Sequence, residues 1–193
     1  LAAPALRFSD CVHCQRDRFE RDGLQAQLTY WRENLRELQT LNLPTDRQRP
    51  LRMTYEGRVL SLPVDAALAA ALQELALQQD SSIFMALLAA FNVLLMRYTG
   101  QGDIEVGVPV AARGGARLRD VVGYFANTVV MRNQLDGASG FTELLKRVNR
   151  TTRAALAHQD MPFERLVAEL SPQRDASRNP LYQVAFALDN FPY

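Results

Sequence analysis

The sequence predicts an α/β protein, in which helices pack in layers against a sheet. Two observations indicate this fold class. Residues 103–110 and 181–188 place apolar side chains at every second position, as strands with one face toward a core do. Residues 83–98 and 141–158 are long runs with helical character. Strands interleaved with long helices imply alternating layers of helix and sheet.

The composition is typical of one globular domain or a large part of one. The chain has 193 residues, of which 48% are hydrophobic and 22% charged. A folded unit of this size buries roughly 70% of the surface of its unfolded chain, so it needs no metal or disulfide for its core. The formal net charge is +1, and we expect neither nucleic acid nor a membrane as a partner. Without a signal-peptide pattern or an apolar run of 18 residues, the chain is expected to be a cytoplasmic piece of a longer protein.

Residues 1–50 predict lead-in helices followed by a connector. From residue 8 to residue 38 the composition favours helix, with a candidate break at 22–23. One apolar stripe marks the buried side, formed by Leu24, Leu28, Trp31 and Leu35. Residues 40–51 contain two prolines and no helical period, so we expect an extended connector over the surface.

The middle of the chain predicts a strand and two helices. Residues 52–63 have the pattern of a strand, and the Ala-rich residues 64–79 that of a helix. Ser81 and Ser82 are suited to cap a second helix that starts at Ile83, because a serine hydroxyl accepts bonds from the free N–H groups of a helix start. This helix is apolar on nearly all sides, and we therefore expect it to be central and buried.

The second half of the chain predicts the remaining strands and helices. The strand at 103–110 directs its valines and its isoleucine to the core and small or polar side chains to the other face. The second half of 122–132 predicts another strand, and an amphipathic helix runs from Phe141 to about His158. A short helix is expected to begin at Pro162, because proline suits the first helical turn. The last strand, at 181–188, presents one apolar face, formed by Tyr182, Val184, Phe186 and Leu188.

The two cysteines and two histidines are the first candidates for chemistry. Cys11 and Cys14 stand at C-x-x-C spacing with His13 between them, a pattern found in metal sites and redox centres. The alternative is a pair of incidental thiols in a reducing compartment, which a polar helical context and the lack of a second cysteine pair favour. We expect no metal. His158 has a structural explanation, because the C-terminus of a helix favours a nearby cation.

Three later stretches resemble a known family. "VGYFANTVVMR" (122–132), "HQDMPFE" (158–164) and "RDASRNPL" (174–181) are similar, in order and spacing, to three core motifs of the condensation domains of nonribosomal peptide synthetases. Upstream, "FSDCVHCQ" (8–15) resembles a degenerate form of that family's Y-x-D-Y-x-x-W segment. The resemblance covers nearly the whole chain.

The resemblance implies the chloramphenicol acetyltransferase-like fold, in which two α/β lobes meet in a V and a tunnel passes between them. It implies that residues 51–193 are the C-terminal lobe, with a mixed β-sheet and packed helices. The N-terminal lobe is then a partner outside this chain. The family's catalytic motif, His-His-x-x-x-Asp-Gly, precedes the segment that Phe8 begins, and it does not occur in these 193 residues.

The function that the resemblance implies is peptide-bond formation. In the family, donor and acceptor carrier proteins reach the tunnel with phosphopantetheine arms, and the acceptor amine attacks the donor thioester. The chain is expected to form one tunnel wall beside these carriers and an adenylation domain, without binding a cofactor itself. Alone it is expected to be inactive, since a positioned general base contributes about 10²- to 10⁴-fold.

The resemblance assigns tunnel and accessory positions. Gly123, Tyr124 and Asn127 are expected to line the tunnel, and Gly123 to allow a close approach that a larger residue would block. Asn127 corresponds to an asparagine near the family's catalytic histidine, where its amide either assists the reaction or satisfies backbone groups of a loop. Arg97 matches an arginine that pairs with the aspartate of the catalytic motif. Its alternative is a solvated cation at a helix end.

The other matching residues are expected to be structural. His158 closes the long helix, Asp160 caps the short helix, and Pro162 starts it. Arg178 and Asn179, which precede Pro180, are expected to fix the start of a core strand. The loop at 113–119 is a candidate contact for the acidic surface of a carrier protein.

Two other functions stay open. A module of this fold that recruits carrier proteins without catalysis would share the tunnel wall, and the sequence upstream of Leu1 distinguishes it from an enzyme. An epimerization domain is a further relative, although "HQDMPFE" and "RDASRNPL" favour condensation.

Overall fold

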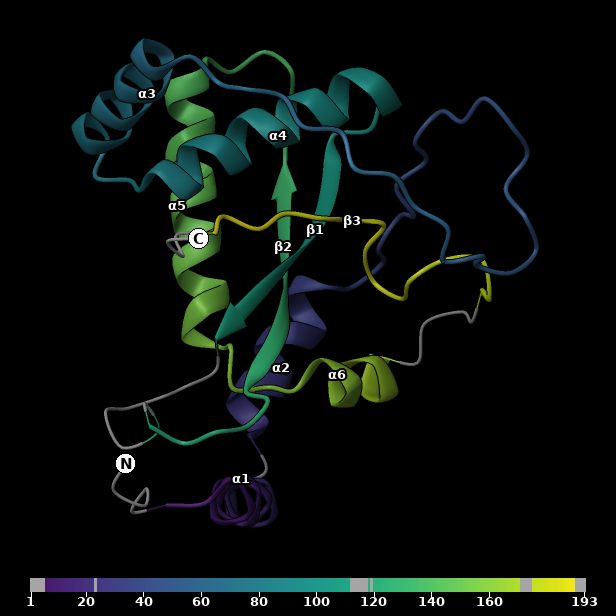
Figure 1. The fold of residues 1–193 in the computed structure, drawn as a ribbon, viewed down its shortest axis with the longest axis vertical. Helices are drawn as coiled ribbons and strands as arrows, with labels where there is room; N and C mark the ends of the chain where they lie inside the picture. Colours follow the sequence, from purple (N-terminus) through teal and green to yellow (C-terminus); the bar gives the residue numbers. More distant parts are fainter. Residues whose placement is uncertain (1–5, 23, 112–117, 119, 171–174, 190–193) are drawn as a thin grey trace.

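The computed structural model describes residues 6–22, 24–111, 118, 120–170 and 175–189 (Figure 1). Its elements, in chain order, are α1 (Phe8–Asp22), α2 (Gln25–Asn34), α3 (Ala66–Gln78), α4 (Ile83–Thr99), β1 (Asp103–Ala111), β2 (Ala126–Gln134), α5 (Phe141–Ala157), α6 (Phe163–Leu170) and β3 (Val184–Ala185). The expected break between the first two helices, the connector after them and the α/β composition are confirmed.

The sheet is mixed, as the resemblance implied. Its order is β2-β1-β3, with β1 and β2 antiparallel and β1 and β3 parallel. Val106 lies opposite Met131 on one side and Val184 on the other. The third strand is much shorter than the predicted 181–188, because Leu181 has a φ of +66° and the chain turns there. A residue in the left-handed region cannot continue a strand.

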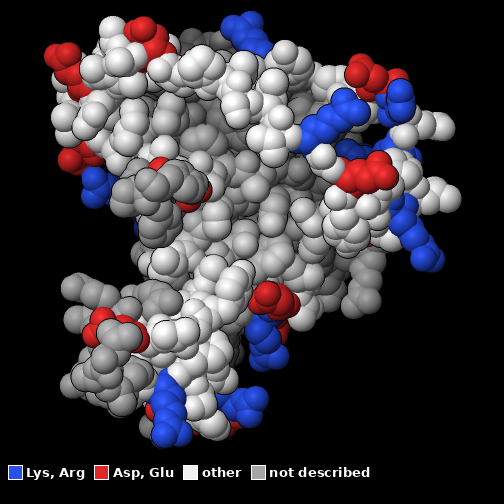
Figure 2. Space-filling model, in the orientation of Figure 1, with Lys and Arg blue, Asp and Glu red and all other residues white. Residues whose placement is uncertain are grey.

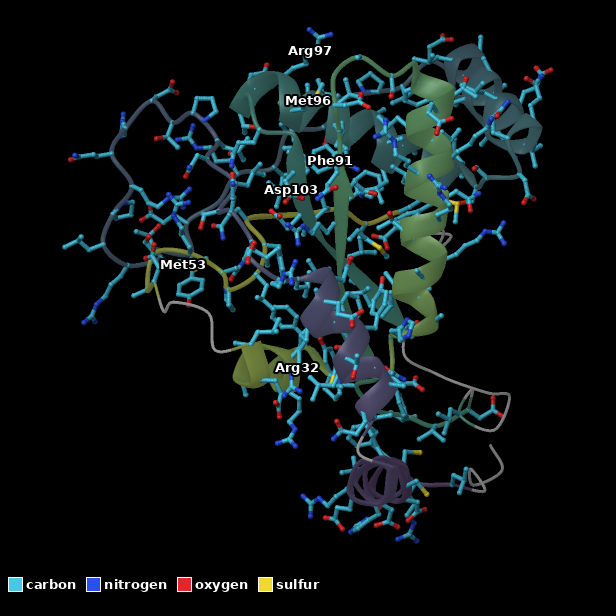
Figure 3. All side chains as sticks on the ribbon, turned by 180° about the vertical axis from the view of Figure 1, so that it is seen from behind. Arg32, Met53, Phe91, Met96, Arg97 and Asp103 are labelled. Atoms are coloured by element: carbon cyan, nitrogen blue, oxygen red, sulfur yellow. The ribbon has the colours of Figure 1, made fainter. Side chains whose placement is uncertain are left out.

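Helices cover both faces of this sheet. α4 and α5 lie on one face, and α2 lies on the other, as Figures 1 and 3 show from opposite sides. Phe186, next to β3, packs against Phe84 and Phe91 of α4, with ring centroids 5.5 Å apart in each pair. The sequence predicted a core on one side of β1 only. The structure corrects this, because Glu105 on the other side is also buried, at 2% exposure.

The start of α4 forms as predicted, whereas α3 begins at Ala66, two residues after the predicted start at Val64. The Asp65 carboxylate accepts bonds from two backbone N–H groups at the start of α3, and the Ser82 hydroxyl accepts one from Met85. The expected burial of α4 is only half correct, since Leu94 is 50% and Tyr98 65% exposed. Within the described part of the chain, no element covers that side of α4.

The strand predicted at 52–63 does not form. These residues run in an extended loop beside the body of the molecule, and Tyr55 and Val59 are almost fully exposed (Figure 1). The backbone N–H of Met53 donates to the carbonyl of Ala176 at 3.0 Å. A strand needs a neighbour to satisfy its backbone groups, and within the described residues the pattern has no strand to pair with.

A partly buried ion pair joins the sheet to α2. The guanidinium of Arg132, on β2, forms a bidentate pair with the carboxylate of Asp103, on β1. Its remaining arm donates to the carbonyls of Asn34 and Arg36, each at 2.8 Å, where α2 has ended. Glu105 lies beside the same guanidinium, 3.9 Å from it. Arg132 therefore joins both strands and the end of a helix.

The stability of this arrangement is expected to depend on pH through Glu105. Burial, with the nearby Asp103 carboxylate, raises the pKa of Glu105 from 4.5 to about 8, against the opposing effect of Arg132. The folded protein then keeps a proton that the unfolded chain releases, so the free energy of unfolding should fall by a few kcal/mol as the pH rises from about 5 to 8. Urea unfolding at both pH values measures this, and Glu105→Gln should flatten the dependence. An unchanged slope in that variant would contradict the assignment.

Gly107→Ala is expected to destabilise the protein by about 1 to 3 kcal/mol. A Cβ on Gly107 would lie 2.6 Å from the ring of Tyr182, which covers the middle of β1. Gly57→Ala is the matched control, because a Cβ there meets no atom within 4 Å. Equal free energies of unfolding of the two variants in urea would show that the Tyr182 ring does not exclude a side chain at position 107.

Candidate functional site

A hollow of about 600 Å³ lies where β1 ends and β2 begins. Its walls come from the end of β1, the segment before β2, the residues after β3, and side chains of α4 and α5. It is lined by Phe84, Val108, Pro109, Val110, Ala111, Gly123, Tyr124, Phe125, Ala126, Met131, Leu156, Ala187, Leu188 and Asp189. Asp189 is the one charged residue of that set. Figure 2 shows that charged side chains lie mainly around the margins of this face of the molecule. The hollow is suited to an apolar or extended neutral group.

Two of the three predicted tunnel residues, Gly123 and Tyr124, line this hollow, whereas Asn127 does not. Tyr124 is 81% exposed and makes an open part of the wall. Gly123 lies against the ring of Phe8, and a Cβ there would collide with that ring. Phe8 also packs edge-on against Phe125, with ring centroids 5.2 Å apart. The close approach expected of Gly123 is therefore present, and it fixes α1 on the segment before β2.

Asn127 does not line the hollow. Its amide nitrogen donates to the carbonyls of Gln159 and Met161 at 2.9 and 2.8 Å, and its amide oxygen accepts the N–H of Phe163 at 3.0 Å. The side chain thus joins β2 to the turn between α5 and α6. This geometry matches the second of the two roles considered, satisfying backbone groups. A role toward substrate stays a prediction.

His158 closes α5 as expected. Its Nδ1 lies 2.8 Å from the carbonyl oxygen of Ala154, and its ring stacks on Tyr30 at 3.9 Å between centroids. Its own carbonyl accepts the indole N–H of Trp31 at 3.0 Å. Both aromatic residues belong to α2, so His158 connects the end of one helix to the face of another.

The start of α6 differs from the prediction in one detail. The first helical residue is Phe163, one later than expected, and the carbonyl of Pro162 accepts the N–H of Leu166. The N–H of Phe163 donates to Oδ1 of Asn127, a contact with a distant strand that local sequence could not reveal. The capping role assigned to Asp160 stays a prediction.

The predicted arginine and asparagine positions lie at the surface. Arg97 projects from the last turn of α4, away from the body of the molecule (Figure 3), and has no ion pair within the described residues. Arg178 lies 3.6 Å from Asp175 and donates to the side chain of Asn42 at 3.3 Å. The carbonyl of Asn179 accepts a bond from Gln183. These last contacts are consistent with a structural role before β3, whereas the partner predicted for Arg97 belongs to the lobe outside this chain.

Cys11 and Cys14 lie on α1, and both are free thiols. In the described ranges, no three His, Cys, Asp or Glu side chains gather as a metal ion would require. No single helix found there is long and apolar enough to cross a membrane, and α3 and α4 meet that test only as a pair bent by 104°. Of the predicted loop at 113–119, all but residue 118 lies outside the described residues.

Sequence reasoning missed most of the wall and the partly buried ion pair. Val108 and Val110 belong to or pack against the core as predicted, and the sequence did not reveal that both also line the hollow. Arg132 was included in the segment 122–132, but no role was assigned to it. The strand register would have indicated its ionic contacts, since Glu105 lies directly opposite Arg132. Opposite charges on paired strands interact, but the register had to be known first.

Comparison with known proteins gives consistent matches. The condensation-domain family matches residues 1–193. The chain is 46% identical over 193 residues to a linear gramicidin synthase protein of Brevibacillus parabrevis, spanning all of this chain and 4% of that protein. It is 42% identical over 191 residues to tyrocidine synthase 3 of the same organism, spanning 98% of this chain and 3% of that protein. The chain therefore spans a small part of the curated relatives it matches.

Solved structures agree with these sequence matches. The X-domain from teicoplanin biosynthesis has a TM-score of 0.89 and 29% identity, over 96% of this chain and 42% of that one. The same domain in a complex with OxyB gives 0.88 over the same shares, again at 29% identity. A four-domain nonribosomal peptide synthetase bound to AMP and glycine gives 0.81 and 28% identity, over 86% of this chain and 13% of that one. The fold class implied by the resemblance is confirmed.

Asn127→Ala is expected to lower the free energy of unfolding by about 2 to 4 kcal/mol, because it leaves buried backbone groups at the turn before α6 without partners. Hydrogen exchange should locate the effect, with the amide of Phe163 losing protection first. Asn149→Ala, which removes bonds from the middle of α5 to Asp80 and Ser81 between α3 and α4, serves as the control and should leave that amide protected. If the backbone amide of Phe163 exchanges as slowly in Asn127→Ala as in the unchanged protein, the side chain of Asn127 does not stabilise the turn.

Proposed function

The chain belongs to the condensation-domain family, and we propose that it forms one wall of an acyl-transfer passage in a nonribosomal peptide synthetase. In this passage a donor acyl thioester on one carrier protein passes to the amine of an aminoacyl acceptor on another, making a peptide bond. The observation that carries the proposal is the hollow beside β1 and β2. Its lining includes the family segment at 123–126.

The chemistry of the hollow supports this use. Its wall is formed almost wholly by apolar side chains and the backbone of Pro109 to Ala111. Such a wall excludes water from an acyl chain and from the thioester, and a water-excluded site favours aminolysis over hydrolysis. The chain's own residues then bind and position the substrate. The proton transfer is assigned to the histidine of the His-His-x-x-x-Asp-Gly motif, which lies outside these residues.

The exposed apolar surface supports a missing neighbour. Residues 51–64 and the adjoining faces of α3 and α4 expose large apolar side chains, namely Leu51, Tyr55, Val59, Leu60, Leu62, Val64, Leu68, Leu77, Leu94 and Tyr98. An apolar surface of this extent marks an interface. Together with the 42% share of the X-domain chain that is matched, it supports residues 51–193 as one lobe of a larger domain. Residues 1–50 then lead into that lobe from the N-terminal lobe.

The partners of this function are carrier proteins and an adenylation domain. Donor and acceptor carriers would present phosphopantetheine arms to the passage, and the adenylation domain would supply the amino acid. The chain would bind those arms without holding a cofactor of its own. A cytoplasmic location follows from this proposal, since the substrates of such an assembly are made there.

A second candidate is recruitment without catalysis. The X-domain is among the similar structures, and it has been solved in a complex with OxyB. This favours a module that binds another protein through the same fold. The two candidates differ in one observable, which is whether the parent protein forms a new amide.

Leu188→Trp in the parent protein is expected to slow amide formation at least about tenfold, because the larger ring enters the hollow and displaces the substrate. Donor and acceptor carriers are loaded, and the new amide is followed by mass. Val12→Trp is the control, since Val12 is exposed on α1, does not line the hollow and is not part of the apolar surface described above.

Two outcomes would contradict the proposal. Equal rates of amide formation in Leu188→Trp and in the unchanged protein would show that the hollow does not bind the substrate. A parent protein that yields no amide with any loaded pair would favour recruitment, and epimerized substrate without an amide would favour an epimerization domain.

A further inference from the structure

The segment before β2 forms part of the wall of the apolar hollow, and it lies beyond the strand ladder. The last described pair between β1 and β2 joins Ala111 to Ala126. Gly123, Tyr124 and Phe125 precede this pair, and all three line the hollow. A ladder fixes a backbone through hydrogen bonds to the neighbouring strand, so contacts other than this ladder have to hold the segment.

Phe8, the first residue of α1, supplies such a contact. Its ring packs edge-on against the ring of Phe125, with 88° between the ring planes and 5.2 Å between the centroids. The same ring fills the space beside Gly123, where a Cβ would lie 2.7 Å from Cγ of Phe8. Edge-to-face aromatic pairs are favourable beyond the apolar area that they bury. One side chain of α1 thus contacts two positions of the wall.

The two positions that contact Phe8 lie on the same side of the segment. Val122 and Tyr124 are 89% and 81% exposed, whereas Gly123 and Phe125, which alternate with them, meet the ring of Phe8. Every second residue of an extended chain points to the same side. Phe8 itself does not line the hollow. Figure 1 shows α1 at one end of the molecule, beside the stretch that leads into β2, so Phe8 supports the wall from outside the hollow.

We propose that Phe8 is a positioning residue for acyl transfer. Its ring holds residues 123–125 in the shape that binds the acyl chain, and it acts through these residues, since it lies outside the lining. This inference rests on the proposed function, in which residues 1–50 lead in from the lobe that carries the catalytic histidine. The contact of Phe8 then ties the wall of the hollow to the part of the chain that arrives from that lobe.

The first test follows the deuterium uptake of residues 122–126 in the parent protein. Phe8→Ala should raise the rate of uptake roughly tenfold or more, because the segment loses its support and opens locally. Phe8→Tyr keeps the ring and should exchange like the unchanged protein. Val12→Ala is the matched control, since Val12 lies one turn further along α1 and is 40% exposed, against 37% for Phe8. The backbone amide of Phe163, which Asn127 holds, should stay protected in every variant and reports that the fold is intact.

The second test measures amide formation in the parent protein with a short donor, alanyl, and a long donor, 2-aminodecanoyl. Phe8→Ala should raise KM for the long donor roughly fivefold to tenfold and change kcat less than about twofold, because the hollow contributes to binding rather than to proton transfer. The alanyl donor contacts little of the wall, and its KM should stay nearly unchanged. A general loss of folded protein would lower both rates alike. Phe8→Tyr should restore the KM of the long donor.

A pair of substitutions tests the contact itself. Gly123→Ala places a methyl group against the ring of Phe8 and should raise the uptake of residues 122–126. The same change in a Phe8→Ala background should add little, because the space is then open, and residues in contact do not act additively. Gly57→Ala is the control, since a Cβ there meets no atom within 4 Å.

Four results would overturn the proposal. Equal uptake in Phe8→Ala and Val12→Ala would show that the ring does not hold the segment, and additive effects of Phe8→Ala and Gly123→Ala would show that the two positions do not act together. A KM that rises equally for both donors, or for neither, would remove the positioning role while the amide product still supports the proposed function. A parent protein that forms no amide would contradict the proposed function and this role of Phe8 together.

Discussion

Arg132 is the residue on which the arrangement of the layers depends. Its guanidinium donates to the carboxylate of Asp103 on the neighbouring strand and to two carbonyls at the C-terminal end of α2, those of Asn34 and Arg36. The side chain of Arg132 is only 14% exposed, so water cannot fully replace either partner. Removing one member of this partly buried pair leaves the other charge without its partner, which is more costly than losing a fully exposed pair. The position of α2 on the sheet follows from this contact.

Once α2 is fixed, the family segments take structural roles around it. Trp31 and Tyr30 of α2 hold His158, and the turn that follows is held by Asn127 from β2. The segment "HQDMPFE" therefore lies between two anchors. Gly123 and Tyr124, only a few residues before Asn127, line the apolar hollow. Residues of neighbouring family segments thus differ in whether they line this hollow.

The elements that local patterns decide could be predicted, and those that depend on partners could not. The cap at Ser82 and the amphipathic helix ending at His158 follow from neighbouring residues. The extended state of 52–63 and the short β3 depend on which strands are present and on the turn at Leu181. The cap of α6 by Asn127 joins residues 36 positions apart. The family was identifiable from motifs, whereas the wall of the hollow required the fold.

The proposed function requires the apolar hollow to face an acyl group carried on a phosphopantetheine arm. Photolabelling tests this contact: the donor carrier of the parent protein is loaded with an acyl chain that ends in a diazirine, the sample is irradiated, and the labelled peptides are mapped by mass. We expect labels at 122–126 and at 187–188, both of which include residues that line the hollow. Labels confined to α3, with none at these two segments, would contradict the proposed function.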